Sequence, residues 1–387
     1  MSESPVLVVN AGSSSLKLEV VPKKLTVSVE RIGGDATISA SFTEVDAPIL
    51  ETVEQALEFS FELLENEGVL SDLSAVGHRV VHGGEVYTEP TLVTDEVLTK
   101  LDELAHLAPL HNPANVAGIR AARLLLSSLT SEVPHVAVFD TAFHSTLAPK
   151  AYLYGLPRSY AEQGIRVYGF HGTSHDYVTQ EAARVLGRAR ETLKLVSLHL
   201  GNGASAAAVC EGKSVDTTMG FTPLDGLLMG TRTGSLDPSV VLRLIEEKAV
   251  ENVETLLNKQ SGLLGLSGVS NDMRDVRKAA ESGSTDAAQA IGLFCYRIRK
   301  AIGAYAAAMN GLDAVVFTAG IGENDAETRA QCVAGLDWFG IELNDAKNRA
   351  GETVISTPES RVRVLVIPTD EAAMIARAAL EVTGTGH

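Results

Sequence analysis

Apolar residues at the start of the chain form two short runs with a stretch of small polar residues between them. Within residues 5–21, the first apolar run gives way to Asn, Gly and Ser at 10–15, and an alternating apolar and polar run follows. This pattern predicts a strand, a tight turn and a second strand. Residues 195–209 have the same pattern, with Gly and Asn at 201–203 between two apolar runs. Turns of this kind expose backbone N–H groups and hydroxyls, which suits a phosphate group.

A third apolar run ends in a glycine-rich segment farther along the chain. Residues 314–318 are followed by AGIGEN at 319–324, and a helix is expected to start near Asp325. A strand that ends in a glycine turn before a helix N-terminus favours an anionic group. Ordinary β-turns would explain each hairpin alone, but the recurrence indicates two halves around one nucleotide. The chain contains neither GxxxxGK[ST] nor GxGxxG, so neither the P-loop nor the Rossmann fingerprint explains these turns.

Helical periodicity is clearest in two segments. Residues 51–67 place apolar side chains three or four apart and stop at Gly68, and residues 286–310 continue the same spacing over a greater length. Strand candidates alternate with such helices, which indicates α/β layering. These candidates are 133–139, 195–200, 314–318 and 362–367. A length of 387 residues favours two domains, and we place the boundary shortly after His144.

Composition narrows the class of protein. Hydrophobic residues make up 45% of the chain and charged residues 21%, and no apolar run approaches the ~20 residues of a membrane span. The N-terminus lacks the basic region of a signal peptide, so we expect a soluble protein with no membrane partner. Cys210, Cys295 and Cys332 are odd in number and far apart in sequence, which predicts no disulfide framework and no CxxC metal site. A reducing, cytoplasmic location fits these features.

The formal net charge of −17 argues against nucleic acid as a partner, because phosphate backbones are bound by basic surfaces. The same charge constrains any anionic ligand. Nucleotide binding would require local positive charge from a few buried Arg and Lys residues and from a divalent metal.

Charged and polar residues near predicted strand ends supply candidate chemistry. Arg79 lies in an apolar segment flanked by glycines and needs an anionic partner there. Asp140 follows a predicted strand, at the edge where open α/β sheets bind ligands. Arg232 lies in a Gly and Thr loop, and His171 and His175 have an i, i+4 spacing that would hold zinc only with a third ligand, which is not nearby. Structural ion pairs or exposed arginines would explain each residue alone, but together they match the needs of phosphoryl transfer.

Ten short motifs occur in order along the chain. They are VNAGSSSLK, GHRVVHGG, APLHNP, FDTAFH, YGFHGTSH, HLGNGAS, MGFTPLDGLLMGTR, SNDMRD, AGIGEN and PTDE. In these motifs the chain resembles the acetate and propionate kinase family, and the resemblance covers the chain from the first strand to about Ala376. That family belongs to the superfamily of sugar kinases, actin and heat-shock chaperone ATPases.

The resemblance implies an α/β fold of two duplicated ribonuclease-H-like domains, the actin-like ATPase fold, with the nucleotide in the cleft between them. One domain would comprise residues 1–144 closed by a C-terminal helix in 373–387, and the other residues 145–372. The implied activity is a reversible, Mg²⁺-dependent transfer of the γ-phosphoryl group of ATP to acetate, which gives acetyl phosphate and ADP. Mn²⁺ is an expected substitute metal, and a homodimer is implied by the family alone.

The resemblance also assigns roles to individual positions. Asn10 and Glu371 match the magnesium-binding positions, Asp140 the catalytic acid, and His171 with Arg232 the pair that stabilises the transition state. The nucleotide positions are Lys17, His199, Leu200, Gly201, Asn202 and Gly203 for the phosphates, and Asp272, Met273, Arg274, Gly320, Ile321, Gly322, Glu323 and Asn324 for ribose and adenine. The acetate positions are Arg79 for the carboxylate, His111, and Val81, Leu110, Phe170 and Pro223 for the methyl group.

The chemistry of acetate explains these residue types. Acetic acid has a pKa near that of a Glu side chain, about 4.3, so acetate is already a nucleophilic anion at neutral pH. The difficulty is repulsion between two anions, which Arg79, Arg232, His171 and Mg²⁺ would offset. We therefore interpret Asp140 as a residue that orients Arg79 or a metal-bound water rather than as a proton donor.

Three alternatives stay open on the sequence. A propionate or butyrate kinase would share the mechanism, and each extra methylene is worth only roughly 1 kcal/mol in a hydrophobic pocket. An actin-like or chaperone-like ATPase would carry both phosphate hairpins but would have no use for Arg79, His171 and Arg232 together. An inactive binding relative is the third, although every expected charged position is occupied.

Overall fold

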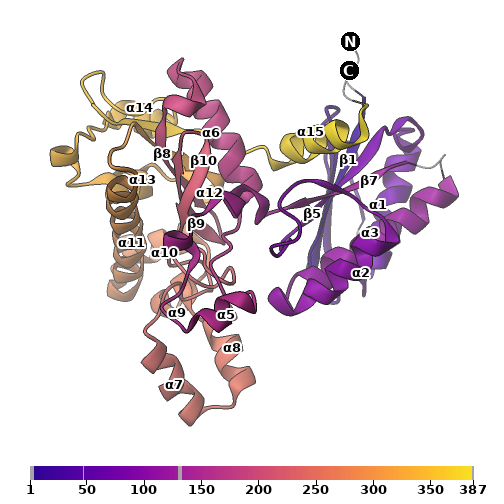
Figure 1. Cartoon of the computed structure of the whole chain (residues 1–387), viewed down its shortest axis with the longest axis horizontal. Helices are drawn as coiled ribbons and strands as arrows, with labels where there is room; N and C mark the ends of the chain where they lie inside the picture. Colours follow the sequence, from indigo (N-terminus) through magenta and orange to yellow (C-terminus); the bar gives the residue numbers. More distant parts are fainter. Residues whose placement is uncertain (1–3, 47, 130–132, 386–387) are drawn as a thin grey trace. The chain divides into compact units, whose positions relative to one another are not determined.

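The computed structural model describes residues 4–46, 48–129 and 133–385, and the chain divides into two compact units. Unit 1 contains the residues up to Ala142 and those from Asp370 onward, and unit 2 contains the residues from Phe143 to Thr369. Among the described residues, each unit has one mixed β-sheet with helices packed against it (Figure 1). The division expected from the sequence, at residues 144 and 372, lies slightly farther along the chain.

The sheet of unit 1 begins with the predicted N-terminal hairpin. Its strands are β1 (Val6–Ala11), β2 (Ser15–Val21), β3 (Leu25–Glu30), β4 (Thr37–Ala40), β5 (Ala75–Val80), β6 (Thr91–Leu92) and β7 (His135–Phe139). Their order is β4-β3-β2-β1-β5-β7-β6, with β1 to β4 antiparallel and β1, β5 and β7 parallel. The register places Asn10 opposite Lys17, so these two side chains share one face of the hairpin.

Helices cover both faces of this sheet. They are α1 (Val53–Asn66), α2 (Asp95–Glu103), α3 (Asn112–Leu129) and α15 (Glu371–Thr383). α1 and α3 bury their apolar residues on one face, and α15 packs on β1, β5 and β7 from the other (Figure 1). α15 approaches closely because Gly77 has no side chain: a Cβ there would lie 2.5 Å from Cγ2 of Ile375. α1 confirms the helix predicted in 51–67, and Thr52 and Gln55 form a capping box at its start.

The sheet of unit 2 also contains a hairpin that the sequence predicts. Its strands are β8 (Lys194–Leu200), β9 (Ala204–Cys210), β10 (Lys213–Thr217), β11 (Ala314–Thr318) and β12 (Arg363–Val366). Their order is β10-β9-β8-β11-β12; β8 and β9 form the second predicted hairpin, and β8, β11 and β12 run parallel. The strands predicted at 195–200, 314–318 and 362–367 are therefore confirmed.

Eleven α-helices are described in unit 2. They are α4 (Pro149–Tyr152), α5 (Arg158–Glu162), α6 (Gly172–Leu186), α7 (Pro238–Glu247), α8 (Val250–Lys259), α9 (Gly262–Ser267), α10 (Met273–Glu281), α11 (Thr285–Met309), α12 (Ala319–Asn324), α13 (Ala326–Val333) and α14 (Asp345–Ala350). α6 packs its Val178 and Ala182 against β8 and β11 in one core cluster. α11, the helix predicted in 286–310, contacts β8, β9 and β10 outside that cluster, as the alternation of strand side chains requires for the opposite face.

The glycine-rich segment after β11 is helical, whereas the sequence predicts a turn there. Residues Ala319–Asn324 form α12, and Asp325 caps the next helix, α13. The carboxylate Oε1 of Glu323 accepts a hydrogen bond from the Ala319 N–H at 2.8 Å, which satisfies one of the free donors of the first turn. A glycine pattern carries no information about this capping, so the short helix was missed.

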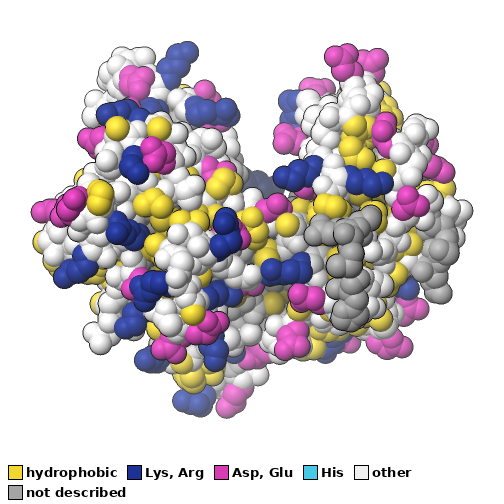
Figure 2. Space-filling view, turned by 90° about the horizontal axis from the view of Figure 1, so that it is seen from above, with side chains coloured by type: hydrophobic (Ala, Val, Ile, Leu, Met, Phe, Trp, Pro, Cys, Tyr) yellow, Lys and Arg dark blue, Asp and Glu magenta, His cyan; other side chains and the backbone are white. Residues whose placement is uncertain are grey.

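The surface mixes charges of both signs. On the face drawn in Figure 2, Lys and Arg side chains are interspersed with Asp and Glu side chains. Within the described part of the chain, every helix is too short or too polar to cross a bilayer. Cys210, Cys295 and Cys332 are all free thiols.

Two histidines form a buried pair between neighbouring strands of unit 1. His78 Nε2 lies 2.7 Å from His135 Nδ1, and the rings are stacked. Burial and the adjacent His135 lower the pKa of His78 well below 6.5, and burial together with Arg123 lowers the pKa of His135 to about 4. Both imidazoles are therefore neutral in the folded protein near neutral pH.

This pair predicts a loss of stability in mild acid. The unfolded chain binds protons at His135 below pH ~6.5 and the folded chain only near pH 4, so the free energy of unfolding falls between these values. Between pH 7 and pH 4.5, we expect the free energy of unfolding to fall by about 2 kcal/mol less in His135→Gln than in wild type. Urea denaturation at a series of pH values measures this, and identical pH slopes would contradict it.

Candidate active site

Unit 2 contains a cavity of about 960 Å³ beside its glycine-rich turns. It is lined by the turn after β8 and by α10, α12, α13 and α14. Its volume is that of a small-molecule site. The predicted nucleotide positions that line the cavity are Gly201, Asn202, Asp272, Met273, Arg274, Gly320, Ile321 and Asn324.

The remaining predicted nucleotide positions lie elsewhere. His199 and Leu200 end β8, Gly203 closes the following turn, and Gly322 and Glu323 belong to α12. Glu323 Oε1 accepts from the backbone N–H groups of Ala319 and Thr369, so its carboxylate holds the backbone of unit 2.

Asp272 and Arg274 stand at the N-terminus of α10. The Asp272 carboxylate caps the helix by accepting from the Arg274 N–H at 2.9 Å, and it also pairs with the Arg274 guanidinium. These hydrogen bonds lower the pKa of Asp272. Asp272 is therefore an ionised acceptor at the cavity wall, a type of group that can accept hydrogen bonds from ribose hydroxyls.

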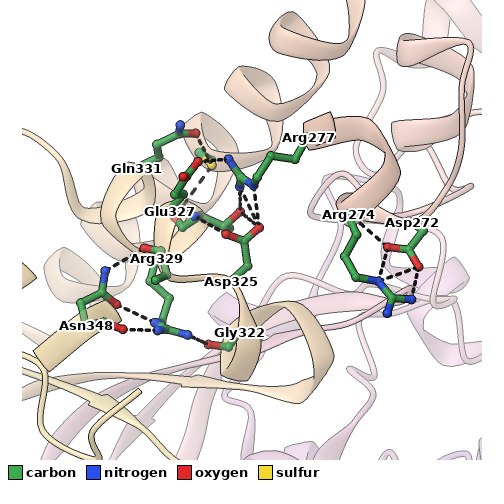
Figure 3. Close-up of polar contacts among 12 residues, drawn as sticks. Asp272, Arg274, Arg277, Gly322, Asp325, Glu327, Arg329, Gln331 and Asn348 are labelled. Carbon is green, nitrogen blue, oxygen red and sulfur yellow. Dashed lines mark hydrogen bonds and ion pairs between the residues drawn. The ribbon is translucent and has the colours of Figure 1, made fainter. Parts of the chain in front are cut away.

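Arg277 joins α10 to α13 along the cavity wall (Figure 3). Its Nη2 donates to Asp325 Oδ2 and Thr328 Oγ1, each at 2.7 Å, and its Nη1 donates to Glu327 Oε2 at 2.7 Å. Because Asp325 also caps α13, one guanidinium fixes the start of that helix against α10.

Arg329 of α13 binds two further segments from inside the protein. It is only 1% exposed, and its hydrogen bonds go to neutral oxygens. Nε donates to Asn348 Oδ1, Nη2 to the Asn348 carbonyl, and Nη1 to the carbonyls of Gly322 and Glu323, at 2.7 to 3.0 Å (Figure 3). Burial lowers the pKa of Arg329. The carbonyls end α12, where the helix dipole favours a cation. Arg329 thereby holds α12 and α14 to α13.

Two of the predicted catalytic residues converge on the turn after β8. A Cβ at Gly203 would lie 3.4 Å from Arg232 Nη2 and 3.5 Å from His171 Nε2. Arg232 Nη1 donates to the Pro223 carbonyl at 2.8 Å, and burial lowers the pKa of Arg232. His171 precedes α6 with a left-handed backbone, φ 56°, a strained conformation for a non-glycine residue.

A network of histidines and hydroxyls surrounds His171. The rings of His171 and His199 stack with centroids 4.1 Å apart, and Ser174 Oγ lies 2.8 Å from His199 Nδ1. Both nitrogens of His175 lie 2.8 Å from serine hydroxyls. Over the described ranges no cluster of three or more His, Cys, Asp or Glu side chains could hold a metal, so His171 and His175 form no zinc site there.

Unit 1 holds the predicted carboxylate receptor at the ends of β5 and β7. Arg79 Nε and Nη2 donate to the two carboxylate oxygens of Asp140 at 2.9 and 2.7 Å, and Glu371 lies 3.7 Å from Arg79 Nε. Burial opposes the charge on Arg79, but Asp140 and Glu371 outweigh it and raise the pKa of the guanidinium. The two-pronged pair fixes the plane of Arg79.

Two buried asparagines of α3 fix the loops beside this pair, and sequence analysis missed them. Asn115 accepts from the Val81 N–H at 3.0 Å and donates to the Ala11 carbonyl at 2.6 Å. Asn112 accepts from the N–H of His82 and donates to its carbonyl. Their only signal in the sequence is a pair of amides three apart at the start of an apolar helix.

The remaining predicted positions are peripheral or apolar. Lys17 is exposed and lies 3.5 Å from Glu19, Leu110 is 43% exposed, and His111 is half-buried beside it. Phe170 is buried in unit 2.

The two α/β units, with their glycine-turn hairpins and the cavity, define a class of protein, the two-domain actin-like ATPase fold. A sequence model described as the acetokinase family matches residues 5–377. The chain belongs to that family.

Individual relatives agree with this assignment. The acetate kinase of Staphylococcus aureus (strain USA300) is 48% identical over 394 residues, which cover 96% of this chain and 97% of that protein. The crystal structure of Porphyromonas gingivalis acetate kinase has a TM-score of 0.89 and 40% identity, covering 98% of this chain and 99% of that one. A propionate kinase from Francisella tularensis has a TM-score of 0.92 and 39% identity, covering 98% and 100%.

Removing the Arg329 guanidinium should destabilise unit 2. Arg329→Met leaves buried oxygens of Asn348, Gly322 and Glu323 without their donor, so we expect the free energy of unfolding to fall by about 3 kcal/mol or more. Urea denaturation measures this. Arg184→Met, which removes an exposed guanidinium paired with Glu181, is the control and should leave the free energy of unfolding almost unchanged. Equal losses in both variants would refute the role of Arg329.

Proposed function

We propose that this chain transfers the γ-phosphoryl group of ATP to acetate. The observation that carries the proposal is the 48% identity to a Staphylococcus aureus protein named acetate kinase over 96% of the chain. The fixed guanidinium of Arg79 supports it, because a guanidinium edge of set orientation suits a small carboxylate.

In the proposed reaction, a carboxylate oxygen of acetate forms a bond to the γ-phosphorus. The bond between that phosphorus and the β,γ-bridging oxygen breaks, and ADP leaves with the electron pair on its terminal oxygen. No proton need be removed from acetate, which is an anion at neutral pH. The protein must chiefly supply positive charge to two anions and hold them in line.

We assign the nucleoside to the 960 Å³ cavity of unit 2. Asp272 would accept hydrogen bonds from the ribose, and the phosphates would follow the turn from Gly201 to Gly203. His171 and Arg232 approach that turn and would donate to oxygens of the transferred phosphoryl group. ATP and ADP are the proposed co-substrates.

We assign acetate to Arg79, with Asp140 as its positioning residue. Both oxygens of Asp140 accept from the Arg79 guanidinium, which favours an orienting role over a proton donor. Arg79 Nη1 has no hydrogen-bond partner among the described residues, so one edge of the guanidinium is available to a carboxylate. Val81, Leu110, Phe170 and Pro223 remain the proposed contacts of the methyl group.

Asn10 and Glu371 are the proposed Mg²⁺ ligands. Their side chains carry amide and carboxylate oxygens, the hard donors that Mg²⁺ prefers, and nucleotide phosphates and water commonly complete such a site. Mn²⁺ suits the same donors. When bound, the ion neutralises charge on the phosphates. Lys17, paired with Asn10 in the β1–β2 register, adds a further positive charge.

Propionate is the second candidate substrate. The Francisella tularensis structure named as a propionate kinase covers 98% of this chain with a TM-score of 0.92. A single methylene separates the two acids and changes binding only modestly. The relatives give no support to an actin-like filament protein or a chaperone-like ATPase.

We also propose a homodimer in the cytoplasm. The homodimer rests on the family resemblance alone, and the location rests on the free cysteines. The mass measured by sedimentation tests the first, and cell fractionation the second.

Substrate preference provides the direct test of the proposed function. ADP formation from ATP and Mg²⁺ should depend on the added acid, with kcat/KM for acetate roughly tenfold above that for propionate and higher still above butyrate. If kcat/KM is highest for propionate, the proposed mechanism still holds but the preferred substrate is propionate. ATP hydrolysis indifferent to all three acids would disprove a carboxylate kinase.

Asp140→Asn tests the orienting role. The amide keeps one acceptor for Arg79 but loses the charge and the second acceptor, so we expect kcat/KM for acetate to fall roughly 10–100-fold while KM for ATP stays within about twofold. Asp313→Asn is the control, because Asp313 pairs with Arg188 outside the cavity. Full turnover by Asp140→Asn with normal magnesium dependence would show that Asp140 has no such role.

A further inference from the structure

A continuous chain of hydrogen bonds leads away from His171 into the core of unit 2. His171 Nδ1 lies 2.9 Å from Ser205 Oγ, and Ser205 Oγ lies 2.8 Å from His175 Nε2. His175 Nδ1 in turn lies 2.8 Å from Ser197 Oγ. Ser205, His175 and Ser197 are fully buried, so bulk water does not compete for these bonds.

The number of hydrogens in this chain restricts where they can be. Ser205 has one hydroxyl hydrogen between two imidazole nitrogens, so it donates to one and accepts from the other. His175 is neutral, because burial and the nearby imidazoles of His144 and His199 lower its pKa well below 6.5. A neutral imidazole has one N–H and one acceptor nitrogen. The direction of each bond therefore fixes the next.

Two arrangements satisfy all the groups. In the first, Ser197 donates to His175 Nδ1, and His175 Nε2–H donates to Ser205. Ser205 then donates to His171 Nδ1, so a neutral His171 carries its proton on Nε2. In the reverse arrangement, Ser205 accepts from an Nδ1–H of His171 and donates to His175. If His171 is then an imidazolium, its Nε2 also carries a proton.

We propose that Ser205 and His175 are positioning residues whose reversible hydrogen bonds let Nε2 of His171 donate to a bound anionic oxygen whether the ring is neutral or an imidazolium. The proposal rests on the proposed function for what Nε2 binds: an anionic phosphoryl oxygen at the turn beside Gly203, which Nε2 faces. Such an oxygen accepts only, so it selects the arrangements with a proton on Nε2. A neutral imidazole with its proton on Nδ1 would instead direct a lone pair at the oxygen.

The apolar surroundings of Ser205 on β9 indicate that its hydroxyl is there to form hydrogen bonds. Its neighbours along the strand are buried alanines, from Ala204 to Ala208. A buried hydroxyl in such a strand is costly unless it is hydrogen-bonded. Here both of its side-chain contacts are imidazole nitrogens.

Ser205→Ala is the kinetic test. The variant removes the partner of Nδ1 without touching His171, so we expect kcat to fall roughly 10–100-fold, with KM for ATP and acetate within about twofold. Ser214→Ala is a matched control, because Ser214 is equally buried and its hydroxyl lies 2.7 Å from an imidazole nitrogen of His144, outside this chain. Equal losses of kcat in the two variants would overturn the proposal.

Nitrogen NMR of histidine-labelled protein tests the proton positions without relying on activity. At pH 8 with ATP and Mg²⁺ present, and with His171 identified by comparison with His171→Gln, we expect the wild-type proton on Nε2 and a hydrogen-bonded acceptor at Nδ1. Ser205→Ala should shift the Nδ1 signal and mix the two tautomers, whereas Ser214→Ala should not. A proton on Nδ1 in the wild-type spectrum, or an unchanged signal in Ser205→Ala, would overturn the proposal even if the enzyme phosphorylates acetate. The expected spectra without kinase activity would instead reject the proposed function.

If Ser205→Ala does not fold, Ser205→Cys replaces it, since the thiol keeps one weak donor hydrogen at the same position. An intermediate kcat and a retained Nε2 proton are then expected. If Ser205→Cys keeps the kcat of wild type although its His171 is a mixture of tautomers, turnover does not depend on this chain of hydrogen bonds. That result would refute the proposal.

Discussion

The fully buried guanidinium of Arg329 organises the walls of the cavity in unit 2. A buried charge is costly, and here carbonyl and amide oxygens of Gly322, Glu323 and Asn348 receive its hydrogen bonds. Because those oxygens belong to α12 and α14, their positions are set by one side chain of α13. The glycine-rich segment keeps its helical form in this setting, and α14 is held where it lines the cavity.

An acidic protein that binds an anion needs local positive charge at the binding site. Arg79 is held by two oxygens of Asp140, and Arg277 is held by Asp325 and Glu327 at the edge of the cavity. Arg232 is different, because it donates to the Pro223 carbonyl and burial lowers its pKa. An incoming phosphate would relieve the unfavourable burial of Arg232, whereas Arg277 is already neutralised and is better suited to structure.

The local pattern of the chain predicted most of the scaffold. Both hairpins, the helices in 51–67 and 286–310 and the strand of 314–318 follow from periodicity and turn residues, which act over a few positions. The helix of residues 319–324 escaped prediction, because its first turn is capped by Glu323 and not by its glycines. Arg277, Arg329, Asn112 and Asn115 escaped because each acts through contacts with other helices or loops, which the periodicity of one element does not show.

The sequence by itself determined the two-part α/β plan, the family and the residue types that could handle a phosphoryl group, since motifs and periodicity are written in neighbouring positions. Only the tertiary structure decided how these residues are used. Periodicity could not show that both carboxylate oxygens of Asp140 accept hydrogen bonds from Arg79. It also could not show that the Glu323 carboxylate accepts from backbone N–H groups rather than facing the cavity. Nor could it show that Ser205 lies between two imidazoles. These roles depend on distances between groups from separate elements, which packing sets and local sequence does not.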